Sequence, residues 1–372
     1  MKILSVVGAR PNFMKVAPLH RAILRSDRFS SFIVHTGQHY DERMSDVFFR
    51  QLEMPEPDVY LGVGSGTHAQ QTARVMTAFE EVVLREEPDL VVVVGDVNST
   101  LACSLVAAKC HINVAHVEAG LRSNDRDMPE EINRIVTDSI SDFLFVTEQS
   151  GVDNLLSEGV ARDKIHFVGN VMIDSLVRFR EKAASSRILE ELSLDNTPYV
   201  LMTMHRPSNV DREEGLRSLL ETIERVAAGR TLVFPMHPRT RQRFADFRLE
   251  KRLDAVRNLK LLEPLGYLEF LRLMEKAAVV ITDSGGIQEE TTFLRVPCLT
   301  LRDTTERPVT VEIGSNELLP MDPSAIARRV ESISTAGREI GAVPPKWDGK
   351  AAERIVAVLE NELRDVSSAH AA

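Results

Sequence analysis

The chain of 372 residues is 43% hydrophobic and 27% charged, which is long enough for two globular domains. Its net charge of −10 argues against a general nucleic-acid surface, although local arginines and lysines can still hold a small anion. No apolar run approaches the roughly 20 residues that span a bilayer, and Met1 leads directly into an apolar run without a signal-peptide pattern. Composition therefore predicts a cytoplasmic protein that binds neither nucleic acid nor membrane.

The cysteines indicate a reducing compartment. Cys103, Cys110 and Cys298 are odd in number, far apart and set among apolar residues, so free thiols are expected. No CxxC pair or Cys/His cluster is present, and we expect no metal and no cofactor.

The first half of the chain alternates short apolar runs with helical patterns, which is typical of a doubly wound parallel sheet. Residues 54–67 are rich in Pro and Gly and predict a loop after a helix over 44–52. Helices are also expected over 11–24, 68–86, 98–109 and 148–158. The predicted strands cover residues 3–7, 32–36, 90–94, 113–117, 143–146 and 165–168.

Charged residues follow several of these strands. Arg10 and Lys15 begin the helix after the first strand, where open α/β sheets bind ligands, although solvated surface charge is the alternative. Asp96 and Glu118 follow neighbouring strands, so we expect two carboxylates in one crevice, where repulsion and burial raise at least one pKa. The alternative is that Asp96 caps the next helix and Glu118 pairs with Arg122.

A further carboxylate is expected at the same crevice. Pro129 starts a helix whose first turn is acidic, which is ordinary capping chemistry. The spacing also places Glu130 and Arg134 one turn apart on one helical face.

The second half repeats the pattern after an interdomain passage across 169–197, in which a helix is expected over 171–184 and residues 185–197 are polar. Polar residues follow four of its strands: His205, His237, the Ser284-Gly285-Gly286 turn and an Arg-rich turn around Arg307. Because they share one sheet edge, they predict a single cleft. The predicted strands cover 199–203, 232–236, 259–262, 279–282 and 298–301, and an amphipathic helix over 350–363 is expected to pack back on the body.

The stretch 279–290 combines a buried strand, a glycine pair and a helix N-terminus. Backbone N–H groups can approach a phosphate there, and the helix dipole favours its charge. Glu289 or Glu290, one turn into the helix, is placed to bind a ribose diol. An ordinary strand–turn–helix connection is the alternative, because short glycine motifs are weak evidence.

Several longer motifs occur in a characteristic order: Val7–Pro11 with Lys15, Thr36–His39, Gly95-Asp96, His116–Arg122, Pro129–Arg134, His205-Arg206, Asp283–Glu290 and Arg302–Pro308. With these motifs, which span residues 3–316, the chain resembles the non-hydrolysing UDP-N-acetylglucosamine 2-epimerases. The resemblance implies the GT-B fold, with two Rossmann-like doubly wound domains facing a central cleft. The domains would cover 1–169 with 350–372, and 170–349.

The resemblance also implies a reaction and residue roles. The family interconverts UDP-GlcNAc and UDP-ManNAc by eliminating UDP and adding it back to a glycal, without metal or NAD. Catalysis would use Asp96, Glu118, Glu130 and His205. The UDP-sugar would be bound by Arg10, Lys15, Arg134, His237, Leu265, Phe270, Ser284, Gly285, Gly286, Glu290 and Arg307. A homodimer is expected.

The chain departs from many bacterial members where those bind a second, activating UDP-GlcNAc. Pro207 replaces their second Arg, and 64–67 lacks their Arg before the next helix. We therefore expect no second-site activation. A C2 epimerase of UDP-2,3-diacetamido-2,3-dideoxyglucuronate remains open as an alternative, with Arg122, Arg126 or Arg206 as the cation for its carboxylate. A GT-B glycosyltransferase, a silent nucleotide-sugar binder and a hydrolysing epimerase also remain open.

Overall fold

The computed structural model describes residues 1–38, 53, 55–336 and 341–369, with the side chains of Arg10, Ala336 and residues 364–369 excepted. The chain forms two compact units: Met1–Arg178 together with Pro345–Ala372, and Phe179–Pro344. The boundary falls within helix α7 (Val171–Ala184), inside the interdomain passage expected across 169–197. The return to the first unit at Pro345 lies near the expected position, residue 350.

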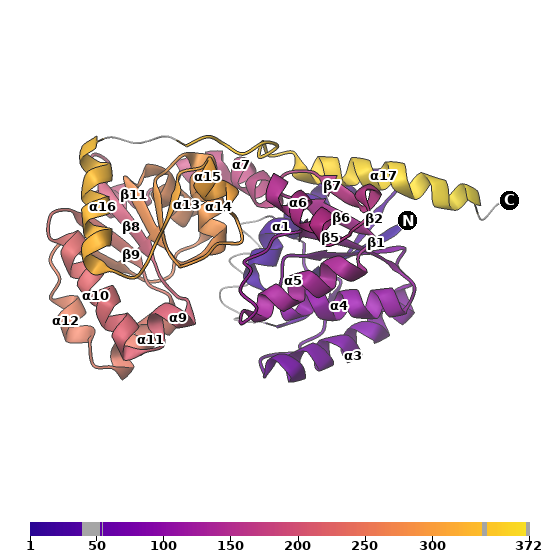
Figure 1. Ribbon diagram of the computed structural model, residues 1–372, viewed down its shortest axis with the longest axis horizontal. Helices are drawn as coiled ribbons and strands as arrows, with labels where there is room; N and C mark the ends of the chain where they lie inside the picture. The colour runs from indigo at the N-terminus through magenta and orange to yellow at the C-terminus, as the bar shows by residue number, and fades with distance from the viewer. Residues whose placement is uncertain (39–52, 54, 337–340, 370–372) are drawn as a thin grey trace. The chain divides into compact units, whose positions relative to one another are not determined.

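The first unit is built on a parallel sheet whose described strands run in the order β3-β2-β1-β4-β5-β6-β7. The central strands are buried on both faces, because helices cover both sides of the sheet (Figure 1). Its strands are β1 (Lys2–Val7), β2 (Ser30–His35), β3 (Val59–Tyr60), β4 (Leu90–Val94), β5 (Asn113–Ala119), β6 (Phe143–Val146) and β7 (Ile165–Phe167). Its helices are α1 (Arg10–Ile23), α3 (His68–Glu86), α4 (Asn98–Lys109), α5 (Pro129–Ile140), α6 (Gln149–Ser157), the first part of α7 and α17 (Ala351–Ala369).

The C-terminal helix α17 packs on the first unit, as its amphipathic pattern predicts. Both carboxylate oxygens of Asp174 accept hydrogen bonds from its first turn, from Ala351 N at 3.0 Å and Ala352 N at 2.7 Å. Trp347, just before the helix, is buried and donates from Nε1 to the Thr147 carbonyl at 3.0 Å. These contacts attach the end of the chain to the unit in which the chain begins.

The second unit has its own parallel sheet, in the order β10-β9-β8-β11-β12-β13. Its strands are β8 (Tyr199–Thr203), β9 (Thr231–Pro235), β10 (Leu259–Leu262), β11 (Val279–Thr282), β12 (Cys298–Leu301) and β13 (Asn316–Leu319). Its helices are α8 (Ile188–Glu191), α9 (Pro207–Val210), α10 (Glu213–Ala227), α11 (Pro238–Asp246), α12 (Glu250–Asp254), α13 (Tyr267–Lys276), α14 (Gly285–Leu294), α15 (Val309–Glu312) and α16 (Pro323–Ala336).

Each sheet reverses its strand order at one point, between β1 and β4 in the first unit and between β8 and β11 in the second. Ligands of open α/β sheets bind at such switch points, outside the carboxyl ends of the strands. The candidate residues of the sequence therefore gather at one predictable edge of each sheet.

Three expectations about the elements were wrong or incomplete. The predicted loop over 54–67 contains β3, a strand of two residues. The polar passage contains α8, and β13 follows the last predicted strand. The helix expected over 44–52 lies outside the described residues. Among those residues, no helix is long and apolar enough to cross a bilayer.

Candidate active site

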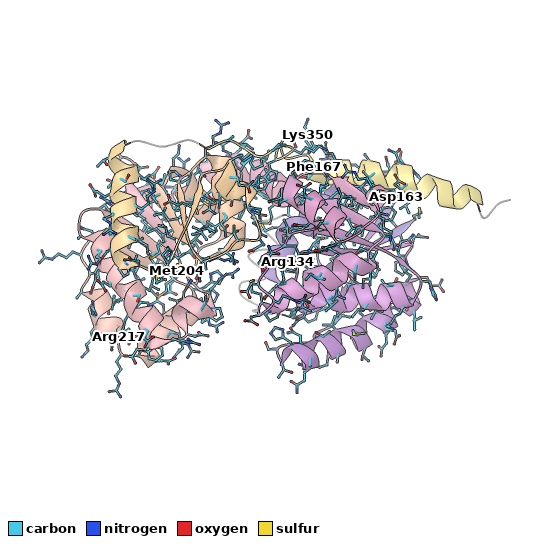
Figure 2. All side chains as sticks on the ribbon, in the orientation of Figure 1. Arg134, Asp163, Phe167, Met204, Arg217 and Lys350 are labelled. Atoms are coloured by element: carbon cyan, nitrogen blue, oxygen red, sulfur yellow. The ribbon has the colours of Figure 1, made fainter. Side chains whose placement is uncertain are left out.

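In the first unit, Asp96 stands at the switch point of the sheet. It follows β4 and Gly95, whose φ of +68° turns the chain at the strand end. Arg134 of α5, labelled in Figure 2, donates to Asp96 Oδ2 from Nε at 3.0 Å and from Nη2 at 2.7 Å. The Arg134 side chain is only 3% exposed, whereas that of Asp96 is 29% exposed. Asp96 is thus a fixed carboxylate that solvent or a ligand can reach.

The sequence predicted that Glu118 follows the end of the neighbouring strand, but the residue lies within that strand. It is part of β5, at a bulge where the register with β6 shifts between Val117 and Ala119. Its φ is +78°, a conformation that side chains rarely adopt and that clusters at functional sites. The bulge aims this buried side chain at Lys15, with which it forms an ion pair.

That ion pair excludes one alternative for Glu118 and gives Lys15 a partner within the protein. Glu118 does not pair with Arg122, which instead binds Asp138 at 2.8 Å and Glu158 at 2.7 Å. Lys15, expected beside a phosphate, is buried with its ammonium on Glu118. Each of the two catalytic candidates on β4 and β5 therefore has its own cation, which offsets the expected repulsion between them.

The first turn of α5 carries two carboxylates, one buried and one half-buried. Glu131 is buried, pairs with Arg134 and accepts from Ser123 N and Asn124 N, both at 3.0 Å. Burial tends to raise the pKa of Glu131, but these N–H groups and the Arg134 charge keep it below its ordinary value. Glu130 is half-buried and has no ion-pair partner among the described residues. Glu131, which sequence reasoning missed, is thus structural, and Glu130 is the acid left available.

In the second unit, the helix α14 starts at the expected glycine pair. Ser284 is its N-cap residue, with extended backbone, and its N–H donates to Thr282 Oγ1 at 3.0 Å. The next N–H groups have no acceptor within the helix, so they are free to bind an anion. A Cβ on Gly285 would lie 2.8 Å from Arg307 Nη1 and 2.9 Å from Glu306 Oε1, so any larger residue would force the turn or these side chains to shift.

A buried charge network lies against this turn. Arg307 binds Glu289 at 2.6 Å and also Glu306, which accepts from Arg302 at 2.8 Å. Arg307 is therefore neutralised within the protein rather than solvated. Within the motif, Glu289 is the acid that this network pairs with Arg307.

Glu290 accepts a hydrogen bond from the Tyr267 hydroxyl at 2.8 Å. Burial and the neighbouring Glu290 charge hold the pKa of Tyr267 well above its ordinary value, so the phenol stays a donor. Tyr267 begins α13, directly after Leu265 and the N-cap Gly266, and half-buried Phe270 follows in the same first turn. Sequence reasoning missed Tyr267, whose position at a helix start after a strand was the available signal.

Two histidines stand together at the ends of β8 and β9. The rings of His205 and His237 have centroids 5.6 Å apart. His205 contacts Asp283, the residue that follows β11, whereas His237 is the N-cap of α11 and accepts from Arg239 N at 3.2 Å. The side chain of Arg10 lies outside the described residues. Among the described residues, no cluster of three or more His, Cys, Asp or Glu is arranged to hold a metal.

Two Rossmann-like sheets with polar sites at their switch points define an α/β enzyme of the GT-B fold. A family model described as UDP-N-acetylglucosamine 2-epimerase matches residues 21–360. The chain therefore belongs to the UDP-N-acetylglucosamine 2-epimerase family and is an epimerase acting on carbohydrates.

Individual relatives agree with this assignment. A UDP-N-acetylglucosamine 2-epimerase from Methanocaldococcus jannaschii is 43% identical, over 96% of this chain and 99% of the relative. The crystal structure of such an enzyme from that organism, in complex with UDP-GlcNAc and UDP, has a TM-score of 0.89 at 42% identity, covering 97% of this chain and 100% of that one. A UDP-2,3-diacetamido-2,3-dideoxy-D-glucuronate 2-epimerase from Pseudomonas aeruginosa is 44% identical, over 86% of this chain and 88% of the relative.

Proposed function

We propose that the protein reversibly inverts C2 of UDP-N-acetylglucosamine to give UDP-N-acetylmannosamine. The observation that carries the proposal is the pair of carboxylates at the ends of β4 and β5, Asp96 and Glu118, each held by its own cation. Family membership supplies the reaction class. A homodimer and a cytoplasmic location stay predictions.

The chemistry follows from the substrate. The C2 proton has no adjacent carbonyl and is not acidic, so direct deprotonation and reprotonation is unfavourable. In the proposed route a base removes the C2 proton while the C1–O bond breaks and its electron pair leaves with UDP. The resulting C1–C2 double bond is a glycal. UDP then adds back to C1 while an acid protonates C2 from the opposite face.

The proton is removed from one face of C2 and returned on the opposite face, so acid/base groups are needed on both sides of the sugar. Asp96, Glu118 and Glu130 are proposed to supply them. Lys15 pairs with Glu118, and Arg134 pairs with Asp96. The N-terminus of α14, at Ser284, Gly285 and Gly286, is proposed to hold the diphosphate throughout.

Further roles are proposed for the second unit. His205 stabilises or protonates the leaving UDP, Glu290 binds the ribose, and Leu265 and Phe270 contact the uracil. His237 and Arg307, with Arg10 from the first unit, complete the proposed nucleotide-binding set.

One of the three candidate cations for the uronate alternative is already paired within the protein. A diacetamido uronate carries a carboxylate that needs a cation, and Arg122 was one candidate. Arg122 is buried and donates to Glu158 from Nε at 2.8 Å and Nη2 at 2.7 Å, besides binding Asp138. Because these carboxylates already neutralise it, Arg122 is a poor partner for a substrate carboxylate, which leaves Arg126 and Arg206 as the candidates for the uronate alternative.

Incubation in D₂O tests the proposal. With UDP-GlcNAc alone, we expect deuterium at C2 and accumulation of UDP-ManNAc, followed by NMR and mass spectrometry. The 3-acetamido uronate analogue is the matched comparison, and its preferential labelling would replace the proposed substrate. An unlabelled nucleotide sugar would point to a glycosyltransferase or a binding protein, and release of free UDP with ManNAc would indicate a hydrolysing epimerase.

We also propose that no second UDP-GlcNAc activates the enzyme. The chain lacks the arginines with which many bacterial members bind the second UDP-GlcNAc. In addition, the Arg74 side chain of α3 packs on the segment before that helix, where it donates to the Ser65 carbonyl at 2.9 Å and lies against Gly66. Rates with UDP-ManNAc should follow a hyperbola. A sigmoidal curve relieved by traces of UDP-GlcNAc would contradict the proposal.

A further inference from the structure

Three successive backbone carbonyls at the end of β4 each accept a hydrogen bond from a side chain of another element. The bonds are Asn12 Nδ2 to Val94 O at 3.2 Å, His116 Nε2 to Gly95 O at 2.8 Å, and Asn133 Nδ2 to Asp96 O at 2.8 Å. The donors come from α1, β5 and α5. The backbone that carries Asp96 is therefore fixed by three parts of the first unit.

His116 differs from the other two donors, because both of its ring nitrogens face acceptors. Nε2 faces the Gly95 carbonyl, and Nδ1 lies 2.6 Å from Asp138 Oδ1, with both side chains only 1% exposed. A neutral imidazole carries a single N–H and would leave one nitrogen lone pair against an oxygen. With an ionised Asp138, the two contacts fit an imidazolium, in which both ring nitrogens donate.

The surroundings of Asp138 support that assignment. Burial raises the pKa of this carboxyl, but the charges and hydrogen bonds of His116 and Arg122 bring it below its ordinary value. Arg122 in turn binds Glu158, so two cations and two carboxylates balance within the cluster.

Asp138 also holds the strand end that carries Glu118. Its Oδ1 binds His116, two residues before Glu118, and its Oδ2 accepts from Gly120 N, two residues after it, at 3.0 Å. The bulge between these points places Glu118 at φ +78°, a strained conformation that persists only when the surroundings enforce it. Asp138 thus clamps both flanks of the bulge.

We propose that His116 and Asp138 form a buried imidazolium–carboxylate pair that positions the two strand ends carrying Asp96 and Glu118. The inference rests on the proposed acid/base roles of those two carboxylates. Through the Gly95 carbonyl the pair fixes the turn of Asp96, and through Gly120 it fixes the bulge of Glu118. Neither His116 nor Asp138 touches the substrate, so both are positioning residues.

The test compares His116→Gln and Asp138→Asn with Asp142→Asn. Asp142 accepts from Val114 N at 2.9 Å and so binds the same strand β5 at its other end. We expect His116→Gln to lower kcat about 10- to 100-fold, since misplacement of a catalytic group by about 1 Å costs that much. KM for the UDP-sugar and Kd for UDP should stay within about twofold. Asp142→Asn should leave kcat unchanged.

The variant Asp138→Asn removes the charge of the Asp138 side chain and keeps its shape, so it tests the charge alone. Asparagine keeps the size of the side chain and can still donate to a neutral His116, so it should retain more activity than His116→Gln. The double variant should be no slower than His116→Gln alone, because both changes act through one pair. A double variant whose losses multiply would overturn the pair as a unit.

Two measurements decide the proposal without enzyme activity. ¹⁵N NMR of histidine-labelled protein should show His116 protonated on both nitrogens at pH 7, and a neutral ring would overturn the proposal. The crystal structure of His116→Gln should show the Gly95 peptide rotated or Glu118 out of the positive-φ region. An unmoved backbone would refute positioning by His116. A wild-type protein that incorporates no deuterium at C2 would instead contradict only the proposed function.

Discussion

The carboxylate of Asp283 lies 3.0 Å from Nδ1 of His205, and the two side chains differ sharply in exposure, at 0% and 40%. Asp283 also accepts the backbone N–H groups of His205 at 3.0 Å and Arg206 at 2.8 Å. Burial raises its pKa, but the hydrogen bond and charge of His205 bring it below the ordinary value. Asp283 thus keeps the His205 proton on Nδ1 and leaves Nε2 to act on a ligand.

Replacing Asp283 by Asn should therefore impair His205 without removing the side chain that holds its loop. We expect kcat to fall about 10- to 100-fold, less than the roughly 100- to 10,000-fold that a whole general acid/base group contributes, with a smaller change in Kd for UDP. Steady-state kinetics and calorimetric titration with UDP measure the two effects. Asp322→Asn, at the exposed start of α16, is the control. Equal kcat in Asp283→Asn and wild type would show that His205 works without its carboxylate.

Gly285→Ala tests the phosphate-binding turn. The added methyl would lie within 3 Å of Arg307 Nη1 and Glu306 Oε1, so the turn or the buried network must shift. We expect Kd for UDP to rise at least about tenfold, which corresponds to about 1.4 kcal/mol. Gly229→Ala is the matched control, because a Cβ there meets nothing within 4 Å. Unchanged UDP affinity in Gly285→Ala would remove α14 from the proposed binding site.

Much of this fold is readable from the sequence because parallel strands buried on both faces are unbroken β-branched runs. The strand predicted over 90–94 is the strand observed, Leu90–Val94, and the position of Asp96 follows from where that run ends. β13 escaped prediction because it is short and begins with Asn316 and Glu317, without an apolar run.

The geometry of the site was less predictable, for physical reasons. Lys15 and Glu118 are 103 residues apart, and only the folded sheet brings them together. The bulge at Glu118 places a glutamate at positive φ, where sequence patterns lead one to expect glycine. Glu130 and Glu131 are adjacent acids in one helical turn, and only packing decides that Glu131 is the buried one.

Lys15→Met tests how much the buried ion pair with Glu118 stabilises the fold. Glu118 is only 4% exposed, and removing its cation is expected to lower the free energy of unfolding by about 3–5 kcal/mol. The double variant Lys15→Met/Glu118→Gln should recover most of this loss, because it removes the buried carboxylate together with its cation. Urea denaturation measures both. A double variant no more stable than Lys15→Met would show that the ion pair is not the cause.

Asp174 links the attachment of α17 to pH. Burial raises its pKa to about 6, although the N–H groups of Ala351 and Ala352 partly oppose this. The folded state therefore binds a proton more tightly than the unfolded chain, whose aspartates titrate near pH 4. The stabilisation from that proton is complete below about pH 4 and is lost as the pH rises through about 6. It amounts to about 3 kcal/mol, since one pKa unit is about 1.4 kcal/mol.

Asp174→Asn should remove that dependence, because its amide carries no titrating proton but can still accept from the first turn of α17. Between pH 4 and pH 6 the free energy of unfolding should fall less steeply in the variant than in the wild type, as measured by urea denaturation at each pH. Asp163→Asn, an exposed carboxylate of the same unit, should keep the wild-type slope. If Asp174→Asn keeps it too, the pH dependence has another source and Asp174 is only a helix cap, whose loss costs the same at every pH.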